Sequence, residues 1–179
     1  MKYIHKINNE INDNCYNLLI RGEAFRIGGQ SKRRTNGSID EQKIAFESIN
    51  KNIIHPLKEK YSKINIYVDI VVLSKEKQEL IKKWFSELKD IKIIHIHKYV
   101  LETQIKTLEQ SLMLIKNNYP ILIIRIDTVF KVKIPFNKMS NTYFYVPFHG
   151  KFGPRINDIM IQIPKKSLFI FKKALKYNK

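Results

Sequence analysis

Arginine and glycine are concentrated in one stretch of the chain, directly after a continuous apolar run. The run is Tyr16–Arg21, and the stretch continues to Ser38 with Arg21, Gly22, Arg26 and Arg33. Glycines let backbone amides approach a phosphate group, and the guanidinium fork of arginine binds two phosphate oxygens at once. The spacing matches neither a Walker A loop nor the dinucleotide-binding glycine pattern. The stretch therefore predicts either a phosphate-binding loop or a solvated basic loop that has no ligand.

A second group of charged residues ends the most apolar run of the chain, Ile121–Ile126. Arg125 and Asp127 are two positions apart, so their side chains would point to the same face of a strand. A charge beside so apolar a run needs a partner or a ligand. Two interpretations stay open. Arg125 neutralises a diphosphate while Asp127 holds the divalent cation that bridges it, or the two side chains form a local ion pair that closes the strand.

The third group lies in a turn-rich loop, residues 147–158. The loop contains Arg155, and its last residue, Asp158, stands directly before an apolar run. A carboxylate held there could act as general base on an attacking hydroxyl, although a boundary Asp with a purely structural role is the alternative. His95 and His97 alternate on a predicted strand and would share a face, but no third ligand stands at a spacing that matches the usual zinc patterns. The sequence therefore predicts no metal site at these histidines.

The elements that must position these residues alternate between short apolar runs and amphipathic helices. The predicted strands are Tyr16–Arg21, Ile64–Leu73, Ile91–Ile96 and Ile121–Ile126. The predicted helices are one capped by Asp40 that Pro56 ends or bends, one over Lys75–Leu88 capped by Ser74, and one over Leu101–Asn118. Strands separated by helices of this length favour parallel pairing with right-handed crossovers. The pattern predicts an α/β fold, a three-layer α/β/α sandwich with a mainly parallel central sheet.

The C-terminal part follows a different pattern. Short antiparallel strands are predicted over Phe130–Ile134 and Thr142–Phe148, then a strand over Ile159–Ile163 and a helix over Lys165–Tyr177. No repeat and no break in composition divides the chain, so residues 1–179 are predicted to form a single domain.

Composition narrows the class of protein. The chain is 44% hydrophobic, which is enough for a packed core, and its single cysteine, Cys15, cannot form an intrachain disulfide. Neither a signal peptide nor a run of membrane-spanning length is visible, so we expect a soluble, cytoplasmic protein. The net charge of +17 attracts polyanions, but it comes mainly from lysines scattered among Ile and Asn, as in proteins encoded by AT-rich genes. A nucleic-acid-binding α/β domain therefore stays open as an alternative function.

Several segments together resemble one family. The segment LLIRGEAFR (residues 18–26) runs into a helix with ESI (47–49) and IHPL (54–57). Further along are Tyr119-Pro120, the strand ILIIRID (121–127), and Asn157-Asp158 before an apolar run. This combination resembles small GT-A-fold glycosyltransferase-like proteins of large DNA viruses and bacterial polysaccharide clusters. The resemblance covers most of the chain, through short motifs.

The resemblance implies a glycosyltransferase that moves a sugar from a nucleotide-diphosphate-sugar donor to a glycan or protein acceptor. It places Arg21 and Arg26 near the base or the phosphates, makes Asp127 the ligand of Mn²⁺ or Mg²⁺, and makes Asp158 the base on the acceptor hydroxyl. Arg125 stands where other GT-A enzymes carry a second metal carboxylate, and the chain is short for such an enzyme. A GT-A-like binding module without turnover is therefore a third possibility beside the enzyme and the nucleic-acid-binding domain.

Overall fold

The computed structural model describes residues 14–25, 37–97, 104–140 and 160–177. Its centre is a five-stranded sheet in the order β3-β2-β1-β4-β5. The first four strands are parallel and the last is antiparallel to β4. Their bounds are β1 Cys15–Glu23, β2 Lys63–Val71, β3 Ile91–His97, β4 Ile121–Arg125 and β5 Met160–Ile163. The predicted α/β class with a mainly parallel sheet is confirmed.

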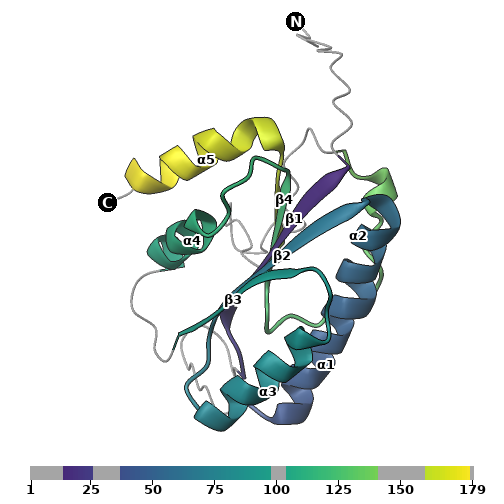
Figure 1. Ribbon diagram of the computed structural model, residues 1–179, viewed down its shortest axis with the longest axis vertical. Coiled ribbons are helices and arrows are strands. Elements are labelled where there is room, and N and C mark those ends of the chain that lie inside the picture. Colours follow the sequence, from purple (N-terminus) through teal and green to yellow (C-terminus); the bar gives the residue numbers. More distant parts are fainter. Residues whose placement is uncertain (1–13, 26–36, 98–103, 141–159, 178–179) are drawn as a thin grey trace, which may run out of the picture.

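Helices cover both faces of the sheet, as Figure 1 shows. One face carries α1 (Ile39–Ile49), the π-helical turn η1 (Asn50–Ile54), α2 (His55–Lys60) and α3 (Lys75–Ser86), and the other carries α4 (Gln104–Met113) and α5 (Lys165–Tyr177). Alternate strand residues enter separate cores. Leu18 and Ile20 of β1 pack on the α1–α3 side, whereas Leu19 packs on the α4–α5 side. The central strand therefore needs apolar residues on both faces, which is why Leu18, Leu19 and Ile20 follow one another in β1.

The first helix begins two residues earlier than predicted. Ser38, not Asp40, is the N-cap: its hydroxyl accepts the Glu41 N–H at 3.1 Å, and the Glu41 carboxylate accepts the Ser38 N–H in return. This reciprocal arrangement is the capping box, and it satisfies two backbone donors that a helix start otherwise leaves open. Asp40 lies inside the first turn, where its charge complements the helix dipole.

Pro56 does not end the helix. The helix runs on into α2 through η1, and Pro56 occupies the first turn of α2. Proline has no N–H, so it cannot bond to the Asn52 carbonyl one turn back. That carbonyl instead accepts the N–H of Ile134 at 3.0 Å, and the Asn52 amide donates to the Phe130 carbonyl. The segment after β4 therefore supplies the backbone hydrogen bond that proline cannot make within the helix.

The same contacts explain why one predicted strand is wrong. Phe130–Ile134 is not a strand: its backbone groups bond to the side chains of Ser48 and Asn52 and to the Asn52 carbonyl rather than to a neighbouring strand. The predicted strand Thr142–Phe148 lies outside the described residues. The predicted last strand appears as β5, and the last helix has the predicted bounds of α5. No helix within the described ranges is both long and apolar enough to cross a bilayer.

Candidate functional site

One row of charged side chains crosses the sheet at the carboxyl ends of the parallel strands. Arg21 of β1 is the register partner of both Asp69 on β2 and Arg125 on β4, and Asp69 is in turn the partner of His95 on β3. Side chains in register on parallel strands point to the same face of the sheet. Here that face is the α4 side, because Thr107 and Ser111 of α4 contact Arg21 and Asp69. Ligands of open α/β sheets bind at this end of the strands.

Asp69 is the centre of the row. Its side chain is 6% exposed, and its Oδ1 lies 3.0 Å from His95 Nδ1 and 2.8 Å from His97 Nε2. The hydroxyl of Ser111 donates to the other oxygen, Oδ2. The two imidazole rings lie side by side with their centroids 4.2 Å apart, and His95 is the more exposed of the two. A buried carboxylate with this many partners is rigidly positioned.

Asp69, His95 and His97 could together hold a metal ion, because one donor atom from each lies within 4.8 Å of the others. A carboxylate with two imidazoles is the donor set of several catalytic metal sites, which keep further positions open for water or substrate. Ser111 would then orient the carboxylate from behind, as outer-shell hydrogen bonds do in metal sites. The sequence offered no third ligand at a matching spacing, and the structure adds Asp69 as a candidate from a different strand.

One sequence signal could have found this residue. Asp69 is the charged residue in the middle of INIYVDIVVL (64–73), an otherwise apolar strand in which a charge is expensive unless it is paired or liganded. It lies 26 and 28 positions before the two histidines. Sequence spacing alone therefore could not join the three, and the parallel register of β2 and β3 does so.

The arginines of the row are also held by neighbours. Arg21 is buried, and its Nη2 donates to Thr107 Oγ1 at 2.9 Å. Arg125 binds Asp127 with two parallel bonds, Nε to Oδ1 at 2.9 Å and Nη2 to Oδ2 at 2.5 Å. The local ion pair that the sequence left as an alternative is therefore present, and both oxygens of Asp127 accept from Arg125. Among the described residues, the group of three possible metal ligands lies on β2 and β3.

The segments that follow β1 and β4 are fixed to each other. The Ile126 N–H donates to the Arg21 carbonyl at 2.9 Å. From α1, the buried Gln42 accepts the Phe25 N–H at 2.6 Å and donates to the Ile126 carbonyl at 2.9 Å. Gly22 has φ +107°, a conformation that residues with a side chain rarely adopt, so glycine is needed where β1 leaves the row. Arg21 and Gly22 thus lie beside Arg125 and Asp127 at the carboxyl ends of β1 and β4, and their role in binding a nucleotide-sugar stays a prediction.

Four other predicted site residues lie outside the described residues: Arg26, Arg33, Arg155 and Asp158. Their roles stay predictions.

A buried amide network lies deeper along the same face and helps to hold the segment after α4. Asn65 donates to Asn17 at 3.1 Å, and Asn17 donates to Asn117 at 2.6 Å. Asn117 donates to the hydroxyl of Tyr67 at 3.1 Å. Burial raises the pKa of Tyr67, and the hydrogen bond from Asn117 works in the opposite direction. These bonds join β1, β2 and the chain after α4, so they fix the helix that carries Thr107 and Ser111 against the sheet.

Comparisons with known proteins find a distant structural likeness and assign no family. No protein-family model matches the chain, and no curated protein matches it. Among solved structures it is similar to 4-diphosphocytidyl-2C-methyl-D-erythritol synthase from Anaerococcus prevotii, with 12% identity and a TM-score of 0.45, over 93% of this chain and 79% of that one. A likeness this distant says nothing about what the protein binds.

Proposed function

We propose that the protein is a metal-dependent glycosyltransferase that uses a nucleotide-diphosphate-sugar donor. One observation carries the proposal: Arg21 and Arg125 stand in the same cross-strand row as Asp69, whose histidine partners complete a possible metal site. A diphosphate carries negative charge that a divalent cation and guanidinium groups neutralise together. The row lies at the carboxyl ends of the parallel strands, where α/β sheets bind nucleotides.

Each arginine is held in place before any ligand arrives. Thr107 fixes the guanidinium of Arg21, and Asp127 fixes that of Arg125 through two bonds. Donors that are already oriented lose little entropy when they bind phosphate oxygens, and this preorganisation favours transfer chemistry. Asp127 acts in the proposal as the residue that orients Arg125. The role of metal ligand, which the sequence gave to Asp127, passes to Asp69 and the histidines.

The donor set also selects among metals. Imidazole nitrogen suits Zn²⁺ and Fe²⁺ best, whereas Mn²⁺ and Mg²⁺ prefer oxygen ligands, and Mg²⁺ in addition gives up its waters reluctantly. Between the two predicted ions, the residues therefore favour Mn²⁺. A bound divalent ion would act as a Lewis acid on the leaving diphosphate. Asp158 remains the proposed base on the acceptor hydroxyl, and Arg26, Arg33 and Arg155 remain proposed contacts of the donor.

Thermal-shift titration with UDP-, GDP- and dTDP-sugars, with and without Mn²⁺, tests the proposal. A nucleotide at a hundred times its Kd stabilises the folded state by about 2.7 kcal/mol, a rise in Tm of roughly 5–10 °C for a domain of this size. Arg125→Met should remove most of that shift. Lys60→Met is the matched control: Lys60 is another half-buried cation, bonded to the carbonyls of Phe136 and Met139 on α2's side of the sheet, away from the row.

Three results would contradict the proposal in different ways. If no nucleotide shifts Tm while oligonucleotides bind with a steep salt dependence, the protein is the nucleic-acid-binding domain. If nucleotides bind but the release of nucleoside diphosphate never exceeds the uncatalysed rate with any acceptor, it is a binding module without turnover. If Arg125→Met and Lys60→Met reduce the shift equally, the row is not the nucleotide site.

A further inference from the structure

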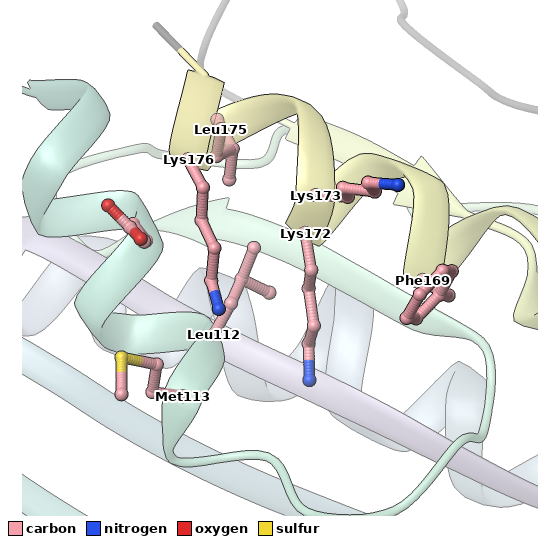
Figure 2. A pocket seen from close by; sticks show the side chains of 8 residues that line it. Leu112, Met113, Phe169, Lys172, Lys173, Leu175 and Lys176 are labelled. Atoms are coloured by element: carbon pink, nitrogen blue, oxygen red, sulfur yellow. The ribbon is translucent and has the colours of Figure 1, made fainter. Parts of the chain in front are cut away.

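A groove between α4 and α5 is separate from the charged row. It has a volume of about 600 Å³. Figure 2 shows side chains of both helices around it, with Lys172 and Lys176 reaching from α5 toward α4. Its apolar residues are Leu112, Met113, Phe169 and Leu175. Lys172, Lys173 and Lys176 provide positive charge beside them and outnumber the single acidic residue of the lining, Glu109. An apolar surface with a cationic edge matches ligands that are apolar at one end and anionic at the other.

The exposed side of α5 has the same character. Phe169 and Ile170 are 69% and 68% exposed, although both are large apolar residues, and Met113 of α4 is 62% exposed across the groove. The helix sequence, KKSLFIFKKALKY, contains five lysines and no acidic residue. Its buried side, which includes Leu168, already packs against α4 and the sheet. Phe169, Ile170 and Met113 therefore expose apolar area that the packing of the core does not use.

The ammonium group of Lys172 in the groove is partly shielded from water. Burial, and then the nearby charge of Lys116, lower the pKa of Lys172, whose Nζ donates to the Ile115 carbonyl at 2.9 Å. An anionic group at this position would offset both effects. A second copy of the chain would instead bring its own lysines against these, so self-association through this face is opposed by charge.

We propose that the α4–α5 face docks on a lipid bilayer rich in anionic headgroups. Phe169, Ile170 and Met113 enter the boundary between headgroups and acyl chains, and the lysines of α5 contact the headgroups. Amphipathic helices with lysine or arginine on one face and large apolar residues such as Phe and Leu on the other bind membranes in this way. They lie in the membrane–water interface without crossing the bilayer. Nucleic acid fits less well, because Ile170 and Met113 offer neither charge nor an aromatic ring to stack on a base.

Vesicle flotation tests the proposal with phosphatidylcholine alone and with phosphatidylcholine and phosphatidylglycerol in equal parts. Wild type should float only with the anionic vesicles. The double variant Phe169→Ser/Ile170→Ser, and separately Lys173→Gln/Lys176→Gln, should each lower the partition coefficient by roughly tenfold or more. The matched controls lie on the opposite face of the sheet: Ile44→Ser on α1, exposed by 54%, and Lys75→Gln/Lys83→Gln on α3. Both should stay within twofold of wild type.

The proposal is overturned if wild type does not float with anionic vesicles. It is also overturned if the Phe169→Ser/Ile170→Ser variant floats as wild type does, because charge alone would then explain the binding. If that variant abolishes a dimer seen by sedimentation velocity, the face binds a second copy. Binding of a monomeric anionic detergent below its micelle concentration, without vesicle binding, would make the groove a site for single amphiphiles. All variants change exposed residues, so an unchanged Tm is expected and is measured alongside.

Discussion

The hydroxyl of Ser111, on α4, contacts Oδ2 of Asp69. The substitution Ser111→Ala removes this hydroxyl and little else. Ser111 is 1% exposed, and its hydroxyl lies within hydrogen-bond reach of both Asp69 Oδ2 and the Thr107 carbonyl. Loss of a hydrogen bond to a charged group costs about 1.5–3 kcal/mol of folding free energy. Loss of an outer-shell bond to a metal-ligating carboxylate costs about 10–100-fold in metal affinity, or roughly 1.4–2.8 kcal/mol. We expect both effects.

The assay is a calorimetric titration of metal-stripped protein with Mn²⁺ and Zn²⁺, together with the urea unfolding of the same preparations. Ser48→Ala is the matched control. The Ser48 hydroxyl donates to the Ala45 carbonyl at 2.8 Å and accepts the Phe130 N–H at 3.0 Å, on the other side of the sheet. It should lose stability and keep its metal affinity. Ser111→Thr, which keeps a hydroxyl, should recover most of the affinity. If Ser111→Ala loses stability but binds metal within twofold of wild type, Ser111 is only structural and our reasoning about Asp69 is refuted.

Three further substitutions test the frame around the site. Gln42→Ala leaves the buried Phe25 N–H and Ile126 carbonyl without their bonds, so it should lower the free energy of unfolding by about 2–5 kcal/mol in urea titrations; a loss under 1 kcal/mol would contradict the bridge. Gly22→Ala places a side chain at φ +107° and should cost about 1–3 kcal/mol, whereas an unchanged urea midpoint would mean that the turn relaxes. Tyr16 is buried, its hydroxyl has no hydrogen-bond partner among the described residues, and burial raises its pKa well above 10.0. The unfolded chain therefore releases this proton first as pH rises past 10, and wild-type stability should fall there. Tyr16→Phe should be neutral or slightly stabilising at pH 7 and should remove its part of that alkaline loss; an unchanged pH profile would refute this.

Most strands and helices of the fold could be predicted because local sequence determines them. A strand buried on both faces must be apolar throughout, and the segments around Leu19 and Ile123 satisfy this. The helix over Lys165–Tyr177 was predictable from its periodicity. The grouping of Arg21 with Arg125 also followed from the rule that parallel strands present their carboxyl ends at one edge.

The parts that sequence could not give depend on contacts between distant segments. Asp69 meets His95 and His97 only because β3 pairs with β2 in one particular register, with an irregularity between Ile66 and Tyr67. A shift of the pairing by one residue would turn the histidines to the opposite face. The helix continues past Pro56 because a segment far along the chain takes up the carbonyl that proline leaves. Local composition predicts neither the register of a strand pair nor a hydrogen-bond partner from a distant segment.

The central claim is that Asp69, His95 and His97 bind the metal ion. It is tested most directly by measuring metal binding by the wild type and by the variants Asp69→Asn, His97→Ala and Asp127→Asn. Each is stripped with a chelator and titrated with Co²⁺, whose visible absorption reports its coordination geometry, and with Mn²⁺ by calorimetry. We expect one ion per wild-type chain, a loss of binding in Asp69→Asn and His97→Ala, and retention in Asp127→Asn, because both Asp127 oxygens contact Arg125 instead. Binding that survives in Asp69→Asn and disappears in Asp127→Asn would contradict the account and return the metal to the end of β4.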